Sequence, residues 1–266
     1  MNYRASVLQY RPEFMAPKTN LSRIAELLSP VESDLVVLPE LALSGYVFDA
    51  LSEVEAIAES IPDGEIFQSF VKLAAERDIS IVYGFAEKDG DVYYNSCALV
   101  NPDGTYHIYR KIHLFNREKL FFTPGDRPFA VHTAKSGIKV GLMICFDWQF
   151  PEAARSLALL GAQIICHPSN LVLPWCQEAM KTRSLENRVF SITSNRTGTE
   201  FNGTQSEYFT GMSQILSTKG EILIRLNDTE EAVYTVVIDP DAAANKAVTE
   251  RNNAFADRRM DMYHLS

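Results

Sequence analysis

The sequence predicts a layered α/β protein in which helices cover sheets that are buried on both faces. Short apolar runs recur along the chain, helical patterns lie between several of them, and tight turns join others. Runs this uniformly apolar have no side suited to solvent, so the sheets that they form need covering helices. The mixture of helical crossovers and direct turns indicates an α+β or layered α/β sandwich.

The strands are predicted from the apolar runs themselves. They cover residues 5–10, 34–38, 79–85, 92–100, 138–144, 162–167, 189–194, 209–216, 221–226 and 232–238. Turn residues at Asp89-Gly90, Pro102-Asp103-Gly104 and Lys219-Gly220 predict hairpins.

The helices are predicted at 21–28, 66–77, 151–160 and 178–188. Pro151 suits the first turn of its helix, and Gly161 suits the position just after the end.

The pattern runs without a linker or a fixed repeat, which predicts one domain over residues 1–266. Within it, residues 252–266 form a C-terminal tail. Phe255, Met260, Met262 and Tyr263 lie there among charges, which suits packing across the interface of a homodimer. A frayed chain end is the alternative.

Composition excludes several classes of function. With 25 basic and 34 acidic side chains the net charge is −9, so nucleic-acid binding is disfavoured. No apolar stretch is long enough to cross a bilayer, and the first residues lack the pattern of a secretory signal, so we expect a cytoplasmic protein. The 4 cysteines and 5 histidines are dispersed, which predicts free thiols, no metal site and no cofactor.

The strongest chemical signal is Cys145, which follows the strand predicted at 138–144 and precedes the helix that starts at Pro151. A nucleophile at such a turn lies beside the amides of a helix start, which favour a thiolate and donate to a developing oxyanion. Taken alone, a cysteine at the end of an apolar strand is more often a small core residue.

Two further segments carry charged residues at strand ends. Glu40 follows an apolar strand and is enclosed by leucines, so burial there would raise its proton affinity and suit it as a base. Lys111 ends a strand before an aromatic loop, where a fixed ammonium stabilises negative charge. Singly, each is better explained as a charge turned to solvent than as a catalytic group.

Together these segments resemble the nitrilase superfamily of carbon-nitrogen hydrolases, over nearly the whole chain. Glu40 stands in a P-E-x-x-x-x-G-Y segment, Lys111 in Y-R-K-x-H-L-F and Cys145 in C-x-D-x-x-F-P-E. The resemblance implies a Glu-Lys-Cys triad, a four-layer α-β-β-α sandwich and pairing into dimers. It also implies a second glutamate after the lysine, for which Glu118 is the counterpart.

The implied reaction is covalent. Glu40 takes the thiol proton, Cys145 attacks an amide or nitrile carbon, and Lys111 with the amide of Phe146 stabilises the charge. Water then hydrolyses the thioester to an acid. Trp148, Asn170 and Tyr46 are expected to line a narrow, mostly apolar pocket, together with Phe121, Phe150 and Trp175.

The substrate is expected to be a small amide or carbamoyl compound, with a small aliphatic nitrile as the alternative. In the nitrilases of this family, Trp and Glu usually follow the nucleophile. In this chain Phe146 and Asp147 stand at these positions. Acyl transfer to an amine is more remote. Two other readings are a papain-like peptide hydrolase that pairs Cys145 with His113 or His167, and a non-catalytic binding relative.

Overall fold

The centre of the molecule consists of two six-stranded sheets. The computed structural model describes residues 1–264, so the last two residues of the expected tail lie outside it. The first sheet has the order β14 (Ala232–Ile238), β1 (Tyr3–Gln9), β2 (Leu35–Val37), β3 (Ser80–Asp89), β4 (Val92–Val100), β5 (Tyr106–Arg110). The second has the order β13 (Ile222–Arg225), β12 (Gln214–Leu216), β9 (Phe190–Asn195), β8 (Ile164–Ser169), β7 (Lys139–Leu142), β6 (Val131–Thr133).

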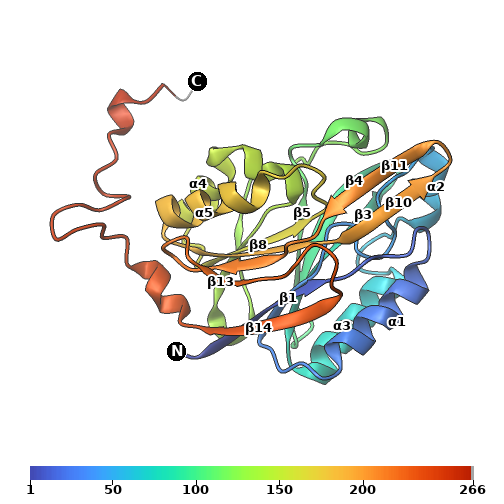
Figure 1. Cartoon of the computed structure of the whole chain (residues 1–266), viewed down its shortest axis with the longest axis horizontal. Helices are drawn as coiled ribbons and strands as arrows, with labels where there is room; N and C mark the ends of the chain where they lie inside the picture. Colours follow the sequence, from blue (N-terminus) through green and yellow to red (C-terminus); the bar gives the residue numbers. More distant parts are fainter. Residues whose placement is uncertain (265–266) are drawn as a thin grey trace.

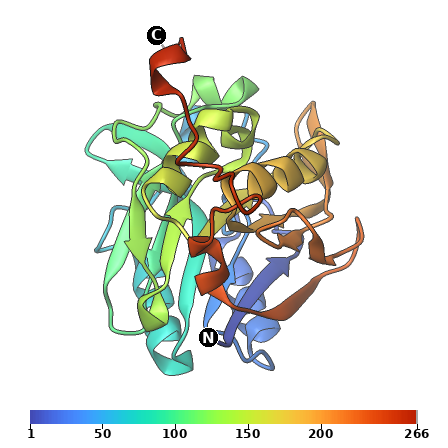
Figure 2. The same ribbon diagram turned by 90° about the vertical axis from the view of Figure 1, so that its left-hand side faces the viewer.

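Helices cover the outer face of each sheet, as Figures 1 and 2 show. Alongside the first sheet lie α1 (Pro17–Leu28) and α3 (Glu65–Arg77), and alongside the second lie α4 (Pro151–Leu159) and α5 (Cys176–Asn187). The short helix α2 (Leu51–Ile57) contacts β3, and β10 (Thr197–Asn202) pairs with β11 (Gln205–Thr210) as a separate hairpin. The four-layer sandwich is therefore confirmed.

Strand β2 illustrates why the apolar runs have no polar side. Leu35 and Val37 belong to the core between the two sheets, whereas Val36 packs into the core beneath α1 and α3. Successive side chains of a strand point to opposite faces, so a strand in this position buries every residue. All three of these residues are fully buried.

Most predicted elements lie within a few residues of the observed ones, but the strand at 209–216 is wrong. Two separate strands share this segment: β11 ends at Thr210 and β12 begins at Gln214. Gly211 and Met212 between them both have φ of 56°. This left-handed backbone turns the chain out of one hairpin and into another sheet. The prediction also omits α2, β6 and β10, which are short or rich in polar residues.

Beyond β14, the chain passes through a short helical turn, Pro240–Ala244, and then runs along the layer formed by α4 and α5. Phe255 packs under the cations of Arg155 and Lys246, whose charged groups lie 5.2 and 4.8 Å from the ring centroid. After it, Arg258 and Tyr263 line a hollow beside α4 together with Arg155, and the chain ends at the periphery of the molecule (Figure 1). None of the described helices has the length and apolar character that a membrane span requires.

The two sheets meet at one edge through a pair of histidines. His107 on β5 and His132 on β6 stack with ring centroids 4.2 Å apart and planes inclined by 16°. Burial, and secondarily the neighbouring His107, lowers the pKa of His132 to about 4. An unfolded histidine has a pKa of about 6.5, so the unfolded chain binds more protons between these values, and stability falls as the pH drops through this window.

We predict that His132→Phe, which keeps an aromatic ring in the stack, reduces the loss of stability between pH 7 and pH 5. Urea unfolding midpoints of the wild type and the variant at both pH values measure this difference. His167, whose pKa burial also lowers to about 4, is common to both proteins and cancels. An equal decrease in both midpoints would contradict the assignment.

Candidate active site

Glu40 lies three residues beyond β2, in a segment that continues along β3. The Leu38 amide donates to the Val82 carbonyl at 2.8 Å, and the Ala42 amide donates to the Gly84 carbonyl at 2.9 Å. A Cβ at Gly84 would lie 2.5 Å from the Glu40 Cα, so only glycine allows the two backbones to approach this closely. The Glu40 side chain is consequently held at the end of the sheet, where it is fully buried.

Lys111 directly follows β5 and points at two carboxylates. Its Nζ donates to Oε1 of Glu40 and to Oε1 of Glu118, both at 2.7 Å. All three side chains are buried. Burial by itself would lower the pKa of Lys111, but the charges of Glu118 and Glu40 outweigh it and raise this pKa above its usual value. The two carboxylates therefore favour the charged form of Lys111.

Glu118 enters the site from a short 3₁₀ helix, Asn116–Leu120. Its Oε1 also accepts a hydrogen bond from the Tyr46 hydroxyl at 2.7 Å. Burial raises the pKa of Glu118, and the nearby Lys111 opposes this shift. One ammonium thus faces two buried carboxylates, an arrangement in which the protonation states of all three groups depend on one another.

Cys145 follows β7 and has a strained backbone, with φ of 41°. It is the first residue of a 3₁₀ helix, Cys145–Gln149. Two neighbours fix this turn: the Ile144 amide donates to Oδ2 of Asp147 at 2.8 Å, and the Cys145 carbonyl lies 2.9 Å from Nε2 of His167. A residue keeps a strained backbone conformation only where surrounding hydrogen bonds and packing hold it. Such residues are frequent in active sites.

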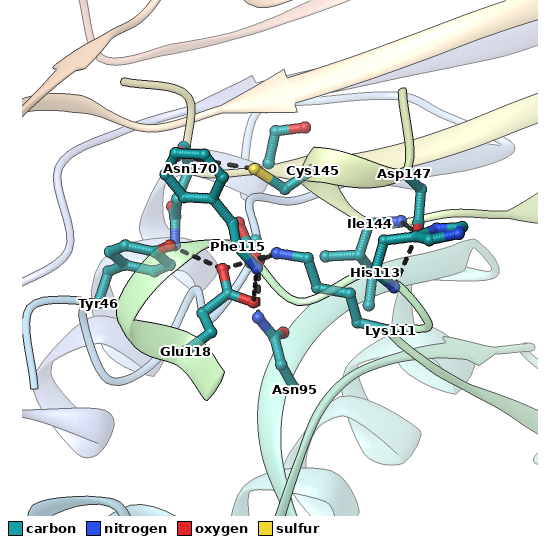
Figure 3. Close-up of polar contacts among 12 residues, drawn as sticks. Tyr46, Asn95, Lys111, His113, Phe115, Glu118, Ile144, Cys145, Asp147 and Asn170 are labelled. Atoms are coloured by element: carbon teal, nitrogen blue, oxygen red, sulfur yellow. Dashed lines mark hydrogen bonds and ion pairs between the residues drawn. The ribbon is translucent and has the colours of Figure 1, made fainter. Parts of the chain in front are cut away.

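The thiol of Cys145 is buried in the structure. Its Sγ donates weakly to the Asn170 carbonyl at 3.8 Å. Burial raises the pKa of this thiol well above its usual value, the charge of Glu40 adds to the increase, and Lys111 opposes it. The thiol therefore needs a base before it can act as a nucleophile. Figure 3 shows Cys145 on one side of the ammonium of Lys111, with Glu118 on the other.

Asp147 connects the segment that carries Lys111 with the segment that carries Cys145. Besides the Ile144 amide, it accepts the Tyr109 hydroxyl at 2.7 Å and lies 2.7 Å from Nδ1 of His113 (Figure 3). His113 is occupied by this contact and by stacking on Phe150, while His167 contacts the Cys145 carbonyl and Thr193. Neither ring hydrogen-bonds to the sulfur, so the arrangement does not resemble a Cys-His pair.

A cavity of about 240 Å³ opens beside the thiol. Most of its lining is apolar, and it is formed by Phe115, Cys145, Phe146, Trp148, Asn170, Leu171, Val172 and Leu173. Asn170 is 2% exposed, and neither its side-chain nitrogen nor its side-chain oxygen has a partner. Unpaired buried amide groups cost free energy, so this side chain is suited to a polar group of a bound molecule.

The other expected lining residues are distributed differently. Tyr46 and Phe121 line a second cavity of about 440 Å³, which also borders Phe115 and Glu118. Trp175 is 60% exposed and lines neither cavity, so its expected place in the pocket is wrong. Trp175 directly precedes α5, and its side chain faces solvent there.

Among the described residues that line these two cavities, Arg117 is the one cation. Arg196 is fully buried and lies 2.6 Å from Oε2 of Glu200, while Arg117 donates to Asp49. Glu200 in turn accepts the Tyr46 amide at 2.7 Å. Arg196 is therefore occupied by Glu200 and has a structural role. No cluster of three or more metal-ligating side chains occurs among residues 1–264.

Sequence reasoning missed Asn95, Tyr109 and Phe115. Asn95 is a fully buried polar residue within an apolar strand, which is the available signal, and its Nδ2 donates to Oε1 of Glu40 at 2.7 Å. Tyr109 and Phe115 stand beside Lys111 in the same segment, but their contacts with Asp147 and with the thiol cavity depend on the tertiary fold.

This chain is similar to known proteins over nearly its whole length. The family model described as carbon-nitrogen hydrolase matches residues 4–247. A nitrilase of Pyrococcus abyssi is 44% identical over 263 residues, covering 98% of both chains. An (R)-stereoselective amidase of a Pseudomonas species is 34% identical and covers 91% of this chain and 86% of its own. The crystal structure of a carbon-nitrogen hydrolase from Helicobacter pylori G27 superposes with a TM-score of 0.82 at 27% identity, covering 92% of both chains.

Proposed function

The chain belongs to the carbon-nitrogen hydrolase family, and we propose that it hydrolyses a small, neutral amide to an acid and ammonia through a thioester on Cys145. One observation supports this most strongly: Lys111 Nζ bridges two buried carboxylates, Glu40 and Glu118, beside a buried thiol. Such a site supplies a base, a fixed positive charge and a nucleophile in an enclosed space, which covalent acyl chemistry requires.

The first half of the reaction forms the thioester. The Cys145 thiol proton passes to Glu40, and the sulfur bonds to the amide carbon. Negative charge on the substrate oxygen is stabilised by the ammonium of Lys111 and by the Phe146 amide. Glu40 then returns the proton to the nitrogen, the carbon-nitrogen bond breaks, and ammonia leaves.

The second half consumes one water molecule. Glu40 takes a proton from the water as its oxygen attacks the thioester carbon, and the carbon-sulfur bond breaks. The proton returns to the sulfur, so the acid departs and the thiol is regenerated. Glu118 holds Lys111 in place and is positioned through the Tyr46 hydroxyl, and we assign it the orientation of the substrate nitrogen.

The acyl group of the substrate lies in the cavity beside Cys145. Trp148 and the neighbouring apolar side chains form its wall, and the Asn170 amide hydrogen-bonds to a polar group of the substrate. The apolar side chains that crowd the space beside the thiol favour a short, apolar acyl group.

A nitrile is the second candidate substrate, because the Pyrococcus abyssi relative is named a nitrilase. Addition of the thiol to the nitrile carbon would give a thioimidate, and two water molecules would convert it to the acid and ammonia. The Phe146-Asp147 pair after the nucleophile favours the amide.

The proposal is tested with matched amides and nitriles of two to four carbons. Ammonia release measures turnover, and intact-protein mass spectrometry measures the acyl adduct. We expect ammonia from at least one amide and an adduct that is absent in Cys145→Ala. Neither ammonia nor adduct from any compound would instead favour a non-catalytic binding protein.

We predict that Lys111→Ala lowers kcat at least about a hundredfold, the scale of losing one oxyanion donor. Lys119→Ala is the matched control, because Lys119 lies on the same loop but is exposed. Steady-state ammonia release from folded samples measures both. Substantial turnover by Lys111→Ala would favour an enzyme that depends on a Cys-His pair.

We also propose that residues 1–266 form one cytoplasmic domain that pairs into a homodimer through its C-terminal tail. Leu159, Leu160 and Leu185 are exposed and lie on or beside α4 and α5. Leu159 lines a hollow together with Arg258 and Tyr263 of the tail. Exposed apolar surface of this kind is typical of subunit interfaces. The four cysteines are free thiols, as a reducing compartment requires.

The dimer yields a separate prediction. Deletion of residues 252–266 should weaken association, so that the truncated protein dissociates to monomers at concentrations where the full chain remains dimeric. Light scattering after size-exclusion chromatography measures both masses. A monomeric full chain, or a truncation that dimerises equally well, would contradict the proposed interface.

A further inference from the structure

Asn95 contacts both charged partners of the proposed triad. It lies within β4 and is fully buried. Its side-chain Nδ2 donates to Oε1 of Glu40 at 2.7 Å, and its main-chain carbonyl accepts the Lys111 amide at 2.8 Å. One residue thus holds the Glu40 carboxylate through its side chain and the main chain of Lys111 through its backbone (Figure 3 shows Asn95 below the ammonium of Lys111).

The hydrogen bonds make the two oxygens of Glu40 different. Oε1 accepts from both Asn95 and Lys111, whereas Oε2 is buried and has no partner. Rotation of the carboxylate about its terminal bond would break both hydrogen bonds of Oε1 at once. Oε2 is therefore the oxygen with a free lone pair, and its direction is fixed.

Asn95 is a poor choice for stability alone. Its own Oδ1 is buried without a partner. A buried acceptor without a hydrogen-bond partner destabilises the folded state, and a leucine of similar size carries no such acceptor. The side chain therefore leaves one buried acceptor unsatisfied, and what it provides in return is the hydrogen bond to the Glu40 carboxylate.

We propose that Asn95 is a positioning residue of the hydrolase: it holds Glu40 so that Oε2 accepts the Cys145 thiol proton. The inference rests on the proposed function, because it requires Glu40 to be the base. It adds which oxygen acts and what holds that oxygen in place.

Asn95→Leu tests the proposal, with Asn101→Leu as the matched control. Asn101 directly follows β4, is 6% exposed, and is hydrogen-bonded to Ser80 and Thr133, away from the site. Hydrogen bonds to charged groups contribute about 1.5–3 kcal/mol, so we expect kcat of Asn95→Leu to fall about 10- to 100-fold. KM should change little, because the contact lies on the base and not on the substrate.

Two further measurements separate positioning from folding. The rate of thioester formation in the first turnover, followed by mass spectrometry, should fall by the same factor as kcat in Asn95→Leu. Urea unfolding should show the larger loss of stability in Asn101→Leu, which should keep the wild-type kcat. Asn95→Ala provides the same kinetic test if the leucine variant does not fold.

Wild-type rates of thioester formation in a folded Asn95 variant would overturn the inference, as would a loss expressed only in KM. That result leaves the proposed function intact, because the wild type would still hydrolyse its substrate. A wild type without turnover and without adduct would overturn the proposed function itself.

Discussion

The pairing of one buried ammonium with two buried carboxylates is the constraint on which the rest of the site depends. Lys111 contacts Glu40 and Glu118 at 2.7 Å, and all three are removed from water. Transferring ions from water into a protein costs several kcal/mol each, and their attraction offsets this only where geometry and further hydrogen bonds are good. The Tyr46 hydroxyl and the Asn95 amide supply these further bonds. The same arrangement leaves one oxygen of Glu40 free, and the thiol, whose pKa burial raises, needs such a base.

The fold meets this constraint by bringing the ends of two sheets together. Glu40 and Lys111 follow strands of the first sheet, and Cys145 follows a strand of the second, so the reactive groups meet at the boundary of the two inner layers. Parallel strands of an α/β sheet direct their carboxyl ends to one edge, which is why such edges collect functional residues. Asp147 joins the segments, since it accepts hydrogen bonds from the Lys111 segment through Tyr109 and from the Cys145 turn through Ile144. Sheet packing thereby determines the distance between base and nucleophile.

The sequence predicts the layers and the type of chemistry better than the walls of the cavity. Uniformly apolar runs such as 35–37 identify buried strands because both faces of these strands are covered, and the segments around Glu40, Lys111 and Cys145 carry the family resemblance in local order. The break at Gly211 and Met212 was missed because apolar residues on both sides continue the pattern across a left-handed turn. The position of Trp175 in the chain predicts a place in the pocket, yet 60% of its surface is exposed. Asn95 and Asp147 act through partners on other segments, and no local pattern indicates which residue a buried polar side chain contacts.

The central claim is that the Cys145 thiol depends on Glu40 for its reactivity. The most direct measurement is the rate at which iodoacetamide alkylates Cys145 at neutral pH, with wild type and Glu40→Gln compared by mass spectrometry. Glutamine keeps the shape of the side chain but accepts a proton far less readily. The account predicts prompt alkylation of Cys145 in the wild type and a large decrease in Glu40→Gln, while the buried Cys97, Cys166 and Cys176 stay unmodified in both. Equal rates of Cys145 alkylation in the two proteins would contradict it.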